Sequence, residues 1–417
     1  MATATLNGKL VGMVSFSPYP HDPRPRRTAE ALLKEGMSVD VICLKDGNSP
    51  RREVSDRLNI RRLSIEHHRG GVLSYTYQYS AFILASTAIL ALRSLKRRYD
   101  LIYVHNMPDI LVLCALIPKL MGAKVILDQH DPIPELMATI FNLDNRSLAV
   151  RVMEWLEKWS IARANRVITV NIACQRIFTR RSRATEKIGV VMNAPDEAIF
   201  GFNRPRPVFG GRGAPEEPLI IMYHGSIVER NGLDLAVDAL ALVRSRISAQ
   251  LRIYGHATSF LEKVIQDARS KGLQDQVQYL GPRRLEELAR EIEGCSLGII
   301  PNHRNPFSEI NTPTRIFEYL ALGRPVIVPR TAGIRDYFDE ASLLFFEPGS
   351  AKDLAARITY AMSHPAEVAE ILQRGQNVYQ QHRWVAERLG LIKLVSGLLC
   401  GPTTLAGEGP VPAKQER

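Results

Sequence analysis

Two successive runs of alternating apolar strands and amphipathic helices organise this chain. The first run occupies residues 1–199 and the second occupies residues 218–380. Between them, residues 200–217 are rich in Pro, Gly and Arg and have no usable periodicity, which is typical of an interdomain linker. Strand–helix alternation predicts parallel sheets covered by helices. We therefore predict an α/β chain with two doubly wound, Rossmann-like domains that face a central cleft.

The remaining segment follows the second run. We expect residues 381–400 to form a helix that packs back on the first domain. Residues 401–417 are rich in Pro, Gly and Ala, and such a composition predicts a disordered tail.

Composition is that of an ordinary globular protein. Of the 417 residues, 45% are hydrophobic and 23% are charged, which is enough apolar material for two buried cores. The five cysteines are scattered, with no CxxC pair and no Cys/His cluster. This spacing disfavours a disulfide framework or a zinc site and indicates reduced thiols, so we expect a cytoplasmic protein.

The longest uncharged stretch is Val72–Leu92. Serine, threonine, glutamine and tyrosine residues interrupt its first half, and only Ala81–Leu92 is consistently apolar. A run this short predicts a buried or interfacial helix, and we expect no transmembrane span. The first ten residues do not have the pattern of a secretory signal.

Nearly all of the net charge of +11 lies in the first half. Residues 1–200 hold 28 Lys and Arg against 19 Asp and Glu, whereas residues 201–417 hold 26 against 24. The asymmetry favours an anionic partner, such as a membrane surface or a phosphorylated substrate; a solvated basic face is the alternative. Aromatic residues are not interleaved with the basic clusters, so we expect no nucleic-acid partner.

A glycine loop follows the first strand of the second run. The strand at 218–223 leads into His224 and Gly225, and a helix begins after a second glycine at 232. The free N–H groups of that helix, together with Arg230 in the loop, suit a pyrophosphate. The same arrangement is also a routine structural turn.

A second motif lies at residues 312–327. Arg315 and Glu318 are three positions apart on one predicted helix, hence neighbours on its surface. A carboxylate beside a phosphate site can accept hydrogen bonds from two ribose hydroxyls, as in dinucleotide-binding folds. An exposed Arg/Glu pair without function is the alternative.

These motifs resemble the nucleotide-sugar-binding half of family 4 glycosyltransferases with the GT-B fold. The resemblance extends over residues 9–398. In the first half it includes the segments at residues 22–42 and 99–136. The matching segments of the second half are HGSIVERNGLD at 224–234, TPTRIFEYLALGRPVI at 312–327 and TAGIRDYF at 331–338.

The resemblance assigns donor contacts residue by residue. It implies that Glu318 holds the donor ribose. It also implies a diphosphate site formed by Gly225, Ser226, Arg230 and Arg315. Two cations that family members often carry in the glycine loop are replaced here, by Ser226 and Asn231. The resemblance leaves Arg230 as the only cation of that loop.

Other positions follow from the same resemblance. A second glutamate of the family falls on an isoleucine here, and its neighbours Glu309 and Asn311 are the candidate donor-sugar contacts. The family's reaction-centre histidine matches His130, with His105 as the competing position. Arg24 and His105 are candidates for the acceptor side.

The implied activity is transfer of a sugar from a nucleoside-diphosphate sugar to a hydroxyl acceptor with retention of configuration. We expect no cofactor. The sequence contains no Asp-x-Asp motif, so we also expect no metal. The expected acceptor is a polysaccharide or lipid-linked glycan, with the protein peripheral on the cytoplasmic face of a membrane. Two alternatives stay open: a sugar-nucleotide epimerase or hydrolase, and a non-catalytic sugar-nucleotide-binding subunit.

Overall fold

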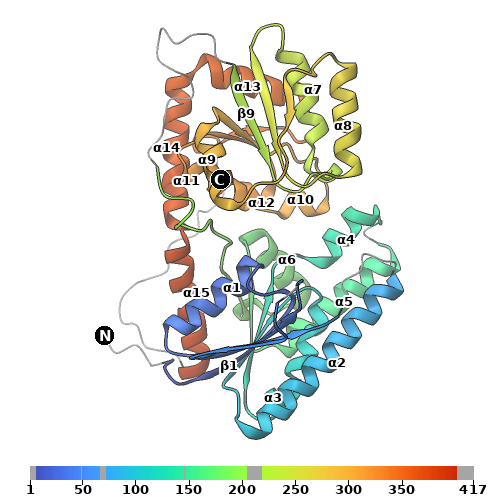
Figure 1. Ribbon diagram of the computed structural model, residues 1–417, viewed down its shortest axis with the longest axis vertical. Coiled ribbons are helices and arrows are strands. Elements are labelled where there is room, and N and C mark those ends of the chain that lie inside the picture. Colours follow the sequence, from blue (N-terminus) through green and yellow to red (C-terminus); the bar gives the residue numbers. More distant parts are fainter. Residues whose placement is uncertain (1–5, 48, 66–71, 145, 204–217, 402–417) are drawn as a thin grey trace. The chain divides into compact units, whose positions relative to one another are not determined.

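The computed structural model describes residues 6–401 except 48, 66–71, 145 and 204–217 (Figure 1). Most of the predicted linker and nearly all of the predicted tail therefore lie outside the described residues. The described residues form two compact units. The first includes residues up to 129, 159–168 and those from 389 onward, and the second includes 130–158 and 169–388. The predicted domain boundaries stay a prediction.

The first sheet has eight strands in the order β3-β4-β2-β1-β5-β6-β7-β8. The pairings of β1 with β2 and β5, of β2 with β4, and of β5 with β6 are parallel, and β3 is antiparallel to β4. Its strands are β1 Leu10–Pro18, β2 Ser38–Leu44, β3 Arg52–Ser55, β4 Leu58–Leu63, β5 Leu101–His105, β6 Lys124–Gln129, β7 Arg166–Thr169 and β8 Ile188–Val190.

Helices connect and cover these strands. Strand β5 is buried throughout and β1 over its first six residues, as expected for parallel strands covered on both faces. The helical elements of this part are α1 Pro23–Lys34, α2 Val72–Lys96, η1 Asp109–Ala115, α3 Leu116–Leu120, α4 Ile133–Phe141, α5 Leu148–Arg163, α6 Ile172–Ser182 and η2 Thr185–Lys187.

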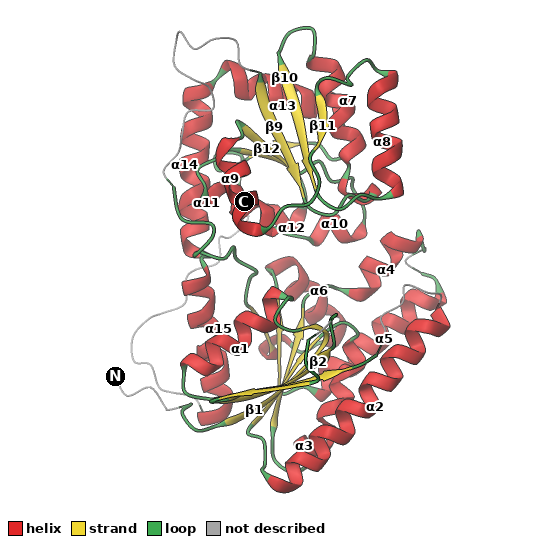
Figure 2. Cartoon of the chain, viewed as in Figure 1, coloured by secondary structure: helices red, strands yellow, loops and turns green. Residues whose placement is uncertain are grey.

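The second sheet has six strands, in the order β11-β10-β9-β12-β13-β14, and its strand pairs are parallel. In the view of Figure 2, helices lie on both sides of this sheet, and two buried clusters fill the space between them. Its strands are β9 Leu219–His224, β10 Ala249–Tyr254, β11 Val277–Tyr279, β12 Leu297–Ile299, β13 Val326–Pro329 and β14 Leu344–Phe346. The helices that follow the linker are η3 Glu229–Asn231, α7 Leu233–Val243, α8 Ser259–Ser270, α9 Leu285–Gly294, α10 Pro306–Ile310, α11 Thr314–Ala321, α12 Ala332–Arg335, α13 Ala351–Ser363, α14 Pro365–Gln381 and α15 Trp384–Cys400.

The two parallel-sheet units confirm the predicted fold class. The sequence analysis did not identify the hairpin of β3 and β4, because all four residues of β3 are exposed and charged residues interrupt its apolar pattern. Nor does α2 begin at Ala81 as expected; it begins at Val72. The window Thr76–Lys96 of this helix is long and apolar enough to cross a membrane by composition alone, with a mean hydropathy of 1.2.

Candidate active site

Strand β9 ends at a turn that only glycine can make without strain. Gly225 has φ +120°, and a Cβ there would lie 3.2 Å from the Nη1 atom of Arg315. Gly232, where α7 begins, has φ +65°, and a Cβ there would lie 1.9 Å from the backbone oxygen of Pro301. Both positions combine a left-handed backbone with close neighbours, which only glycine tolerates. The predicted glycine loop is therefore a closely packed joint.

Arg315 of α11 lies directly against this loop. Its Nη1 atom donates a hydrogen bond to the backbone oxygen of His224 at 2.5 Å. The guanidinium carbon is 5.5 Å from the centroid of the Tyr223 ring, a cation–π distance. The structure thus brings together Arg315 and Gly225, which lie 90 positions apart in the sequence.

Glu318, one helical turn further along α11, lies beside the end of the same strand. Its Oε2 atom is 3.5 Å from Nε2 of His224. His224 is buried, and burial together with the nearby Arg315 charge holds its pKa well below the usual value. The imidazole is therefore neutral at neutral pH, so His224 and Glu318 do not form a charged pair.

Tyr319 fixes the position of α11 on the sheet. Its hydroxyl donates to the backbone oxygen of Met222 at 2.8 Å. Its ring covers Gly298 of β12, where a Cβ would lie 2.6 Å from the ring atoms. Tyr319 is thus held in place by its hydrogen bond to Met222 and by close packing on Gly298, which has no side chain.

The glycine loop is ordered by polar contacts of its own. The backbone oxygen of Ser226 accepts hydrogen bonds from the Tyr223 hydroxyl and from Nδ2 of Asn231, each at 2.7 Å. Burial raises the pKa of Tyr223, while the charges of Arg315 and Arg230 oppose that rise. The charges of both arginines therefore act on the Tyr223 hydroxyl. Asn231 serves here as a structural donor within the loop.

The two candidate sugar contacts lie on and just after α10. The Oε1 atom of Glu309 accepts a hydrogen bond from the backbone N–H of Ala332, at the start of α12, at 3.1 Å. Its other oxygen lies 3.7 Å from Nε of Arg304. Asn311 ends α10 and is half-buried. Glu309 thus already binds the first turn of α12, and a contact of either residue with a sugar stays a prediction.

At the carboxyl edge of the first sheet, the buried carboxylate of Asp128 contacts three side chains. Two of them, Arg24 and His105, are predicted site residues. Asp128 accepts hydrogen bonds from Nε of Arg24 at 3.0 Å and from Nη2 at 2.6 Å. The Tyr103 hydroxyl donates to its Oδ2 atom at 3.0 Å, and Nδ1 of His105 is 3.4 Å from the same oxygen. Arg24 is therefore oriented by an ion pair, and its predicted role on the acceptor side is untested.

His105 is completely buried in this cluster. Burial lowers its pKa to about 4, and the Arg24 charge acts in the same direction while Asp128 opposes both. A neutral imidazole at this position cannot supply positive charge at neutral pH. His130, the other candidate for the reaction-centre histidine, is half-buried, and the choice between the two stays a prediction.

His105, Asp128 and His130 are also close enough to be considered as metal ligands. One candidate ligand atom from each lies within 4.8 Å of the others. However, both Asp128 oxygens already accept hydrogen bonds from the Arg24 guanidinium. A fixed positive charge at that distance opposes a cation, so the donor set does not fit a resident metal well.

Sequence reasoning did not identify Asp128, Tyr103 and His224. A signal was present for two of them, because Asp128 and His224 both lie where a parallel strand approaches its carboxyl end, the edge at which ligands bind in such sheets. Tyr103 is inside a strand, and only the structure shows that its hydroxyl reaches the carboxylate.

Two family models match the chain and together cover most of it. The glycosyl transferase 4-like domain matches residues 22–194, and glycosyl transferases group 1 matches residues 218–364. With two parallel-sheet units and the loop–helix site described above, the chain is a GT4-like glycosyltransferase of the GT-B fold.

Solved structures and curated relatives agree with this family. Sucrose-phosphate synthase from Thermosynechococcus elongatus has a TM-score of 0.74 at 20% identity, covering 94% of this chain and all of that one. HepE from Anabaena has a TM-score of 0.69 at 17% identity, covering 94% of this chain and all of HepE. The probable glycosyltransferase WbjE of Pseudomonas aeruginosa is 20% identical over 64% of this chain, and the match spans 65% of WbjE. An uncharacterized glycosyltransferase of Methanocaldococcus jannaschii is 20% identical over 85% of this chain and 88% of its own length.

Proposed function

We propose that this glycosyltransferase moves a sugar from a nucleoside-diphosphate sugar to a hydroxyl acceptor, with retention of configuration. The observation that carries the proposal is the convergence of Arg315 and Glu318 on the glycine turn after β9. A cation and a carboxylate one helical turn apart can bind a diphosphate and the adjoining ribose. Structural neighbours support this class of donor: HepE is described with UDP and with UDP-glucose, and starch synthase IV of Arabidopsis thaliana with ADP and acarbose.

The leaving diphosphate is the chemical difficulty in this reaction. Arg315, Arg230 and the first N–H groups of α7 would stabilise the negative charge that grows on it, and such stabilisation is usually the largest catalytic contribution. The leaving phosphate itself would take the acceptor proton on the same face of the sugar. His130 would position the sugar and phosphate, and this front-face path, unlike a double displacement, requires no carboxylate nucleophile.

We also propose that the reaction needs no divalent metal. The poor fit of the Asp128 cluster to a cation supports this, because its carboxylate is committed to Arg24. Activity should persist in excess EDTA. Complete loss on chelation, with recovery on adding Mg²⁺ or Mn²⁺, would contradict the metal-independent mechanism.

The acceptor is proposed to be a polysaccharide or lipid-linked glycan at the cytoplasmic face of a membrane. A matched relative, the Erwinia amylovora protein AmsK, is named an amylovoran biosynthesis glycosyltransferase and is 24% identical over 39% of this chain and 40% of its own length. The excess of basic residues in the first half supports a peripheral contact with anionic lipid.

One experiment tests the central proposal. The protein is first screened by thermal shift against UDP-, GDP-, ADP- and dTDP-sugars, since a ligand at 100 times its Kd stabilises the folded state by about 2.7 kcal/mol. The donor that stabilises it is then incubated with and without glycan acceptors, and products are analysed for the anomeric configuration. Release of free sugar or an epimer without acceptor would instead identify a hydrolase or epimerase. Donor binding with no turnover would indicate a non-catalytic subunit, which the replacements at Ser226 and Asn231 favour.

A further inference from the structure

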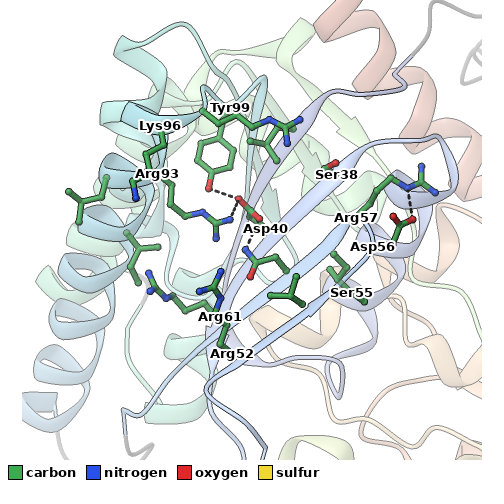
Figure 3. Close-up of a pocket in the computed structure, with 17 residues that line it drawn as sticks. Ser38, Asp40, Arg52, Ser55, Asp56, Arg57, Arg61, Arg93, Lys96 and Tyr99 are labelled. Carbon is green, nitrogen blue, oxygen red and sulfur yellow. Dashed lines mark hydrogen bonds and ion pairs between the residues drawn. The ribbon is translucent and has the colours of Figure 1, made fainter.

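A cavity lies in the first unit, at the edge of the sheet opposite the carboxyl ends of the strands. Its volume is about 620 Å³, within the range of small-molecule sites. The first residues of β1, β2 and β4 line it, together with the last turns of α2 (Figure 3). From Tyr99 in this cavity to His105 at the other end of β5 the chain runs six residues, about 20 Å in an extended strand.

Positive charge dominates the lining of this cavity. Six cations face two carboxylates, Asp40 and Asp56. The cations come from the β3–β4 hairpin and from α2; they are Arg52, Arg57, Arg61, Arg93, Lys96 and Arg97. The hairpin and the end of α2 therefore bring like charges into one cavity.

Two of the arginines oppose each other directly. Arg52 of β3 pairs in register with Arg61 of β4, so both side chains leave the same face of the hairpin. Figure 3 shows them side by side at the cavity wall. Like charges at such a cross-strand pair destabilise a sheet. Among the described residues, no carboxylate forms an ion pair with either of them, and both side chains are exposed.

The central carboxylate of the cavity is already engaged elsewhere. Asp40 accepts hydrogen bonds from Nδ2 of Asn59 and from the hydroxyl of Tyr99, each at 2.9 Å. Nη2 of Arg93 lies 2.7 Å from its Oδ2 atom. Asp40 therefore orients Arg93 and does not reach the two hairpin arginines with an ion pair. Asp56 is largely exposed and lies 3.5 Å from Nε of Arg57.

A structural explanation accounts for only part of the cluster. Cations in the last turn of a helix interact favourably with its dipole, which explains Arg93 and Lys96 in α2. That effect does not apply to the hairpin, where Arg52 and Arg61 lie on strands. An anion bound in the cavity would neutralise both groups at once.

We infer that this cavity is a second anion-binding site, which takes a phosphate or diphosphate group through the hairpin arginines and the end of α2. Arginine pairs are suited to phosphate because each guanidinium presents two parallel N–H donors. The phosphate can belong to a soluble metabolite or to a lipid headgroup; Leu92, which lines the cavity and is 64% exposed, would meet the apolar part of either. The inference concerns a site remote from the donor-binding residues and does not rest on the proposed function.

The test begins with inorganic pyrophosphate, measured by calorimetry on Arg315→Ala protein. That substitution weakens the diphosphate site proposed for the donor but leaves Arg230 in place, so the cavity is reported by the part of the binding that the substitutions in the hairpin remove. Adding Arg52→Glu and Arg61→Glu should weaken pyrophosphate binding at least tenfold. Adding Arg98→Glu and Lys124→Glu instead changes the net charge equally on residues outside the cavity, and should leave binding within about twofold.

A second arm distinguishes the lipid source. The same pairs of substitutions, made in the otherwise unchanged chain, are compared by co-sedimentation with phosphatidylcholine vesicles that contain or lack phosphatidylglycerol. The hairpin pair is Arg52→Glu with Arg61→Glu, and the control pair is Arg98→Glu with Lys124→Glu. If the hairpin pair abolishes binding to the anionic vesicles and the control pair preserves it, the site is supported with a lipid headgroup as its ligand. Pyrophosphate binding with the same dependence would support it with a soluble phosphate.

Two results would overturn the inference. One is the absence of binding in both arms; the other is equal weakening by the hairpin pair and the control pair, which would show a diffuse charge effect. The proposed function is judged separately, because Arg52 and Arg61 lie outside the donor-binding residues. Turnover of a soluble acceptor should be unchanged in the Arg52→Glu/Arg61→Glu protein.

Discussion

The Nε2 atom of His224 lies 3.5 Å from the Oε2 atom of Glu318, yet the two groups do not form a charged pair at neutral pH. Burial and the nearby Arg315 guanidinium keep the imidazole neutral. Glu318 is therefore not held in a charged pair with His224, and its carboxylate lies at the end of β9 beside the glycine turn. This arrangement suits recognition of two adjacent hydroxyls.

Replacing Glu318 with Ala should weaken binding of the donor and of the free nucleoside alike, since both carry the ribose. Loss of hydrogen bonds to a charged group costs ~1.5–3 kcal/mol, or roughly tenfold to a hundredfold in Kd. Calorimetry with nucleoside and nucleoside diphosphate checks this, and Glu262→Ala, on the exposed side of α8, is the control. Unchanged affinity in a folded Glu318→Ala protein would remove the basis for the whole donor site.

Replacing Arg315 with Ala should weaken binding of the nucleoside diphosphate by roughly tenfold to a hundredfold while leaving nucleoside binding unchanged, because its proposed partner is the phosphate. Lysine at this position should restore only part of the affinity, since an ammonium cannot bind the His224 carbonyl and a phosphate in the same planar geometry. Arg269→Ala, an exposed change on α8, serves as the control. If nucleoside binding fell equally, Arg315 would be a structural residue of the loop.

His130→Ala should lower kcat strongly and change the KM for the donor little, because its proposed contact is with the reacting sugar. Steady-state kinetics over a range of donor concentrations separate the two parameters. His105→Ala is the informative comparison. Turnover that survives loss of His130 and disappears with loss of His105 would assign the reaction centre to the other strand end.

His105 should make the folded state less stable in mild acid. Its pKa is lowered to about 4 by burial, whereas an exposed histidine in the unfolded chain titrates near 6.5. The unfolded state therefore binds the proton first, and stability falls as the pH drops from about 6.5 towards 4. The loss over that range is expected to reach about 3 kcal/mol.

Urea unfolding at several pH values, compared between the natural chain and His105→Gln, isolates this contribution. Asp109, whose pKa burial raises to about 6, changes stability in the opposite direction over part of the same range, but it is present in both proteins and cancels in the difference. Parallel pH profiles for the two proteins would show that His105 does not titrate as proposed.

The elements that sequence predicted well are those whose pattern is local. Strand β9 and helix α11 are short, largely apolar runs bounded by glycine or proline. Their types and their order were therefore predictable, as was the glycine loop after β9. The spacing of Arg315 and Glu318 placed them on one helix face before their common partner, the end of β9, was known.

What the sequence could not show depends on contacts between distant segments. Asp128 and Arg24 are 104 positions apart, and nothing in either local pattern indicates their ion pair. All four residues of β3 are exposed, so its own pattern does not indicate the register with β4 that places Arg52 opposite Arg61.

The packing of Tyr319 on Gly298 has a practical consequence for interpreting variants of this protein. Because the ring covers a position that has no side chain, one added methyl group at residue 298 would push α11 outward and carry Arg315 and Glu318 with it. Overpacking a buried site also costs ~1–3 kcal/mol of stability, so a lower melting temperature and a loss of activity are expected together. A survey of active-site variants that examines only residues in contact with ligand would therefore miss position 298.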